Sequence, residues 1–70
     1  MIRSTKDAHG NTIKVGDEVR IYAVNDWKSG IVVSIAKGHH DYEYGRTIVE
    51  VVIDDPDLPW RRFSSNIERL

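Results

Sequence analysis

Residues 15–35 read VGDEVRIYAVNDWKSGIVVSI, and this stretch decides the fold class. Gly16 and Asp17 form a turn signal, because glycine adopts positive φ at no steric cost and aspartate can bond its own backbone. Residues 18–24 then alternate between apolar and polar side chains, which is typical of a half-buried β-strand. The face expected to point inward carries Val19, Ile21 and Ala23.

A second strand is predicted over residues 30–35, after a loop at 25–29 that contains Trp27. A third strand is predicted over residues 47–53. Alternation in these two strands places the following side chains inward: Ile31, Val33, Ile35, Val49, Val51 and Ile53. The outward apolar side chains would form an exposed strip and a candidate interface, made of Val32, Ile48 and Val52.

The other segments complete an all-β chain. A short entry strand or hairpin is expected around Ile13 and Val15, a strand at 60–63, and a 3₁₀ turn at 64–66 before a last strand carrying Ile67 and Leu70. Residues 36–46 form either a loop or an extended hairpin, and the alternation of Tyr42, Glu43 and Tyr44 favours the hairpin. Besides the entry segment, the sequence therefore predicts five short strands in a single domain, residues 1–70.

Composition narrows the functional classes. The chain has 70 residues and no cysteine, which excludes disulfides and thiolate zinc sites. Ten Lys and Arg residues oppose eleven Asp and Glu residues, and the net charge of −1 argues against a dedicated nucleic-acid binder. No apolar run approaches the roughly 18 residues of a membrane span, and no signal-peptide core follows Met1, so a cytoplasmic protein is expected.

The segments VGDEVRI, SGIVVSI, IVEVVI and SSNIERL resemble the KOW and Tudor-like branch of the SH3-like barrels, over about residues 14–70. The resemblance implies a five-stranded SH3-like barrel of a phage or bacterial small-protein type, with an extended second-to-third hairpin. A photosystem accessory subunit of similar length matches in architecture only. Plasmid-type dihydrofolate reductases share the architecture too, but their pore-lining Val-Gln-Ile-Tyr segment has no counterpart in WRRFSSNIERL.

Catalytic and metal-binding patterns are weak. His39, His40 and Asp41, with the distant His9, could suggest a metal site. Adjacent histidines on an extended chain point to opposite sides, however, and seldom bind one ion together. The acidic turn at 54–57 lacks the spacing of a calcium loop. No nucleophile elbow, triad spacing or phosphate-binding glycine loop is present. We expect no enzyme activity, no metal and no cofactor.

Aromatic and basic residues are the best candidates for ligand contact. Trp27 and the hairpin tyrosines are expected to form one platform, with three cations, Lys28, Lys37 and Arg46, at the same end. The full candidate set is Tyr22, Trp27, Lys28, Lys37, Tyr42, Tyr44, Arg46, Trp60 and Arg62. Two interpretations compete with it. One tryptophan and Phe63 would be structural lids over the barrel ends, and the cations would be ordinary rim charges that pair with Asp41, Glu43 and Glu50.

The predicted function is that of a non-catalytic binding module, a monomer or weak homodimer. It is expected to act as an accessory or regulatory protein that contacts a protein partner. Binding of single-stranded RNA or DNA is the main alternative, because bases stack on aromatic rings while phosphates meet cations. A reductase-like oligomer is a further alternative.

Overall fold

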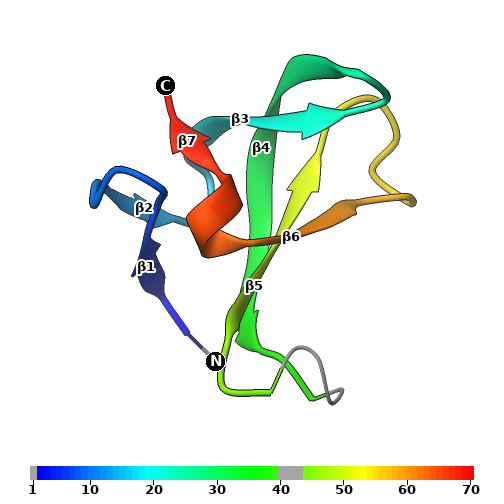
Figure 1. Ribbon diagram of the computed structural model, residues 1–70. Helices are drawn as coiled ribbons and strands as arrows, with labels where there is room; N and C mark the ends of the chain where they lie inside the picture. The colour runs from blue at the N-terminus through cyan, green and yellow to red at the C-terminus, as the bar shows by residue number, and fades with distance from the viewer. Residues whose placement is uncertain (1, 40–43) are drawn as a thin grey trace.

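The computed structural model describes residues 2–39 and 44–70, and this part of the chain is all-β, with no α-helix (Figure 1). The strands are β1 (Ser4–Lys6), β2 (Thr12–Lys14), β3 (Glu18–Ala23), β4 (Asp26–Lys37), β5 (Thr47–Val52), β6 (Trp60–Phe63) and β7 (Glu68–Arg69). The 3₁₀ turn η2 (Ser64–Asn66) precedes β7. The all-β class and the 3₁₀ turn before the last strand are confirmed. Within the described ranges no helix has the length and hydropathy that a bilayer span requires.

β3 to β7 form one antiparallel sheet of five strands in the order β6-β5-β4-β3-β7. β4 is the longest strand, and it pairs with β3 through its first half and with β5 through its second half. Figure 1 shows β3 and β6 crossing β4 and β5 at steep angles, so the sheet is strongly curled. The edge strands β6 and β7 do not pair with each other in the described residues, so hydrogen bonding does not close the sheet into a barrel. A separate two-stranded sheet, β1-β2, packs beside it.

Apolar side chains from both sheets fill one core. Its most buried members are Ile13, Val19, Ile21, Ala23, Val32, Ile35, Val49, Val51 and Ile67. The inward orientation predicted for β3, for Ile35 and for the two valines of β5 is confirmed. Ile53 is partly buried and packs against this core.

The predicted phase of β4 is wrong in its first part. Val32 is 1% exposed, whereas Ile31 and Val33 are each 42% exposed. The cause is a β-bulge between Val32 and Ser34, which adds one residue and exchanges the two faces before Ile35. A prediction that extends the alternation back from Ile35 assumes that no residue is inserted, so it assigns the residues before the bulge to the wrong faces.

The exposed strip predicted from Val32, Ile48 and Val52 does not exist as a surface. Val32 faces the core, Ile48 is only 5% exposed, and Val52 is partly buried. Ile48 lies in the middle of the sheet, opposite Ala36 in β4 and Phe63 in β6. Its neighbours cover it, although it lies on the opposite face from Val49.

The two connections flanking β4 differ from one another. The loop predicted at 25–29 is wrong. Ala23 pairs with Asp26, so only Val24 and Asn25 connect β3 to β4. Both have positive φ, 53° and 61°, as a type I′ turn requires. At the other end, Lys37 pairs with Thr47, and Gly38 forms an isolated bridge with Tyr44. The predicted extension of this hairpin falls partly on residues 40–43, outside the described residues.

Gly30 lies where β4 passes very close to the end of β5. A Cβ atom built there would lie 2.5 Å from the carbonyl oxygen of Val52 and 2.7 Å from Cγ1 of Val51. No side chain fits at that distance, so glycine permits the close crossing of the curled sheet.

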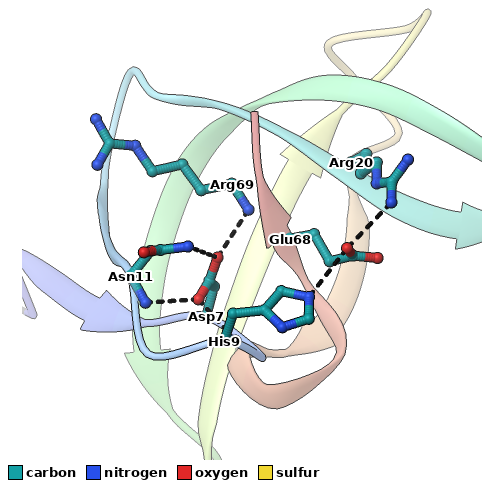
Figure 2. Close-up of polar contacts among 6 residues, drawn as sticks. All are labelled: Asp7, His9, Asn11, Arg20, Glu68 and Arg69. Atoms are coloured by element: carbon teal, nitrogen blue, oxygen red, sulfur yellow. Dashed lines mark hydrogen bonds and ion pairs between the residues drawn. The ribbon is translucent and has the colours of Figure 1, made fainter.

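The Asp7 carboxylate fastens the β1–β2 hairpin to β7 (Figure 2). Oδ1 accepts the backbone N–H groups of His9 and Asn11, at 2.9 and 2.7 Å, and Oδ2 accepts the backbone N–H of Arg69 at 2.8 Å. Asp7 is 6% exposed. Burial by itself would raise the pKa of Asp7, but these N–H donors, Arg69 first, outweigh burial and lower the pKa below its ordinary value.

Candidate functional site

A pocket of about 390 Å³ lies where β7 parts from the edge of β3. β7 pairs with β3 only at Val19 and Arg20, and η2 occupies the chain just before β7. The edge of β3 beyond Arg20 is therefore left without a neighbouring strand, and Tyr22 borders the resulting hollow. The lining residues are Ala8, His9, Tyr22, Trp27, Arg62, Ser65, Asn66 and Glu68.

One wall of the pocket is aromatic. Tyr22 and Trp27 stand opposite each other in the β3–β4 register, because the tight turn at Val24 and Asn25 sets that pairing. Their ring centroids are 5.7 Å apart and the planes are inclined at 76°, an edge-to-face contact. Tyr22 is 52% and Trp27 45% exposed. Both rings therefore keep apolar surface that a ligand can cover.

Arg62 places a cation beside that wall. Its guanidinium donates to the carbonyl oxygen of Tyr22 at 3.3 Å and to that of Arg61 at 2.8 Å. Its Cζ atom also lies 5.3 Å from the ring centroid of Trp60. No carboxylate lies within 4 Å of this guanidinium anywhere in the described part of the chain. Arg62 is thus positioned by carbonyl groups and a ring rather than by an opposite charge.

Glu68, across the pocket, has its charge already engaged (Figure 2). Its Oε1 accepts from Nη2 of Arg20 at 3.1 Å and lies 3.1 Å from Nε2 of His9. These bonds, Arg20 first, lower the pKa of Glu68, so it is ionised at neutral pH. Arg20 in turn lies 5.0 Å from the ring centroid of Trp27. The carboxylate and the aromatic wall are therefore linked through one arginine.

Of the predicted ligand residues, the structure brings Tyr22, Trp27 and Arg62 together in this pocket. Trp60 is partly buried against the core and supports Arg62 from below. Arg46 lies at the pocket margin, where it donates to Oγ of Ser65 at 3.4 Å and stacks 3.7 Å above the ring of Phe63.

The predicted platform of Trp27 with the hairpin tyrosines is not formed by Tyr44. Trp27 is the second residue of β4, whereas Tyr44 bridges Gly38 just after the last residue of that strand, so the two rings belong to opposite ends of β4. Tyr42 lies outside the described residues. Lys28 and Lys37 are likewise separated, since Lys28 pairs with Ile21 and Lys37 with Thr47. The idea of three cations at one end is therefore wrong.

Sequence reasoning missed the polar rim of the pocket: His9, Ser65, Asn66 and Glu68. The sequence pattern gave His9 no role in ligand contact, and Glu68 falls within the predicted last strand. Glu68 meets Arg20 because β7 pairs with β3 across 48 residues of sequence, and no local pattern encodes that register. Alternation placed Arg20 and Tyr22 on one face and was the only available signal.

A second, smaller hollow of about 140 Å³ lies on β4–β5–β6, lined by Ser34, Ala36, Lys37, His39, Ile48, Glu50 and Arg61. None of its described lining residues is a Phe, Tyr or Trp. His40 and Asp41, which the sequence places beside His39, are outside the described residues. Across residues 2–39 and 44–70, no three His, Cys, Asp or Glu side chains gather closely enough to ligate one metal ion.

Comparison with known proteins returns no significant similarity: no protein-family model, curated protein sequence or solved structure matches this chain.

Proposed function

We propose that this chain is a non-catalytic binding module that takes a segment of a partner protein into the pocket formed by Tyr22, Trp27 and Arg62. The half-exposed edge-to-face pair of Tyr22 and Trp27 carries this proposal. Tyr, Trp and Arg are the residue types that dominate the energetics of protein interfaces. A volume of about 390 Å³ accommodates a few side chains.

The proposed architecture is an SH3-like barrel of the KOW and Tudor-like branch. The curled five-stranded sheet and the 3₁₀ turn before the last strand support it. In that architecture η2 and β7 take the chain back toward β3, which is the place where the pocket lies. An accessory or regulatory role follows from a small module with one recognition pocket.

Binding of single-stranded nucleic acid is the second candidate, because Arg20 and Arg62 contact the aromatic wall and Arg46 bonds to Ser65 in the pocket lining. Charge favours a protein ligand. The net charge is −1, and Arg20 is already paired with Glu68. A strand of phosphates needs several unpaired cations in a row.

A peptide library displayed on phage tests the proposal, with selection on the wild-type protein and counter-selection on Trp27→Ala. The matched control is Tyr44→Ala, which removes an 82% exposed ring at the other end of β4. Peptides that bind the wild type and Tyr44→Ala but not Trp27→Ala support a peptide pocket. Oligothymidylate and oligouridylate are titrated in parallel at two salt concentrations. Tight, steeply salt-dependent binding of these without selected peptides would replace the proposal with the nucleic-acid alternative.

A further inference from the structure

We infer that the pocket selects its partner segment by a single carboxylate, bound to the Arg62 guanidinium beside an apolar side chain that rests on Tyr22 and Trp27. This inference rests on the proposed function and names the chemistry that the pocket recognises. It predicts that an acidic residue, or a chain-terminal carboxylate, adjoins an apolar residue in the partner.

Arg62 is pre-organised to receive an anion. The two carbonyl bonds and the Trp60 ring fix the plane of its guanidinium. A guanidinium carries five N–H donors, and these two bonds leave others available toward the pocket that Arg62 lines. A planar fork of donors matches a carboxylate in a bidentate geometry, which ammonium groups cannot reproduce.

The other charges in the pocket do not supply that anion. Glu68 is the carboxylate of the lining, and its oxygen Oε1 serves Arg20 and His9 rather than Arg62. With Glu68 offset by Arg20, the pocket retains the charge of Arg62 as its excess. One excess positive charge suits a monoanion better than a phosphate dianion or a run of phosphodiesters.

The apolar half of the ligand follows from the geometry of the wall. Tyr22 and Trp27 meet edge to face, so both rings present apolar surface at the same opening. Ala8 adds to this surface, while Ser65 and Asn66 place polar groups around it. A carboxylate on Arg62 therefore lies within one residue of a side chain covering the rings.

Three probes that share a benzene ring test this chemistry: N-acetylphenylalanine, its neutral amide, and phenyl phosphate. Each is titrated at pH 7 into ¹⁵N-labelled protein, and the indole N–H of Trp27 and the backbone amides of Tyr22 and Asn66 are followed by NMR. We expect the carboxylate probe to bind about tenfold more tightly than the amide. We also expect it to exceed phenyl phosphate.

Arg62→Gln should remove the preference for carboxylate over amide, because glutamine has no charge and no guanidinium fork. Arg61→Gln, one residue away on the opposite face of β6, is the matched control and should keep the preference. If Arg62→Gln does not fold, Arg62→Lys keeps the charge without the fork and should reduce the preference severalfold.

Equal binding of acid and amide, tighter binding of phenyl phosphate, or no response from the pocket resonances would overturn the inference. These outcomes differ from failure of the proposed function. Library peptides that need Trp27 but carry no required acidic group leave the peptide pocket in place and remove only the carboxylate. Absence of any Trp27-dependent peptide removes the function itself.

Discussion

The substitution Asp7→Asn isolates the bond that ties the two ends of the chain together. An asparagine at this position keeps one oxygen, which can still accept the N–H groups of His9 and Asn11 as Oδ1 does. The other atom becomes an NH₂ group. It then faces the backbone N–H of Arg69, which Oδ2 accepts at 2.8 Å in the native chain.

The size of the effect follows from what is lost. A hydrogen bond to a charged group contributes about 1.5–3 kcal/mol, and a buried N–H left facing another donor has a desolvation cost of its own. The two retained bonds also weaken, because the acceptor becomes neutral. We expect a loss of about 3 kcal/mol in the free energy of unfolding at pH 7. A chain of this length has about 4–10 kcal/mol in total, so the midpoint should fall by roughly 15 °C.

The pH dependence gives this reasoning a sign. The pKa of Asp7 is lowered in the folded state from its ordinary value of 3.8. The stabilisation is therefore fully present above about pH 4 and is lost as the pH falls through the folded pKa. Asp7→Asn lacks this titration. The difference in unfolding free energy between the wild type and the variant should shrink steadily below pH 4.

Urea unfolding followed by circular dichroism, at several pH values from 2 to 7, measures both effects. Asp55→Asn is the control, because Asp55 is exposed and its carboxylate accepts the N–H of Asp57 at 2.9 Å. It should change stability by less than about 0.5 kcal/mol. If Asp7→Asn costs under 1 kcal/mol, or if its cost stays constant down to pH 2, the carboxylate does not fasten β7 as described.

Substitutions at three further positions test other parts of the fold, and thermal unfolding measures each. Gly30→Ala should destabilise the protein by more than about 2 kcal/mol, because its Cβ meets the Val52 carbonyl oxygen at 2.5 Å; near-wild-type stability would contradict the close crossing. Val24→Asn should stabilise it by about 0.5–1 kcal/mol, because Asn tolerates a φ of 53° better than a β-branched residue, and Val24→Ala should gain less. Ile48→Lys should cost about 3 kcal/mol, since it puts a charge where the side chain is 5% exposed; an unchanged midpoint would return Ile48 to the surface.

The sequence carried much of the strand pattern. Alternation identified the buried face of β3 and of Val49 and Val51, because these stretches contain no irregularity. It failed at Val32, where the bulge moves every earlier side chain of β4 to the other face. A bulge depends on how two paired strands accommodate their curvature. The residue types at Val32, Val33 and Ser34 do not predict one.

The residue types of the candidate site could be predicted from the sequence, but the contacts between these residues could not. The sequence pattern selects aromatic and basic residues, and of these Tyr22, Trp27 and Arg62 line one pocket. Tyr22 and Trp27 lie opposite each other because of the two-residue turn at Val24 and Asn25. The sequence does not predict this turn, since valine rarely adopts positive φ. The contributions of His9 and Glu68 depend on pairing between distant strands, which local periodicity does not encode.

The bond between Asp7 and Arg69 joins positions 62 residues apart. Arg69 is also the strand partner of Val19 in β3. On a ribosome, the amino-terminal hairpin emerges long before either partner has been synthesised. Its apolar residue Ile13 therefore remains without its final packing until Ile67, which shares its core, has been synthesised. Such sequence-distant closure slows the search for the native state. The pairing of β7 with β3 can therefore form only after residues 68 and 69 have been synthesised, and the pocket that Glu68 lines is completed in the same late step.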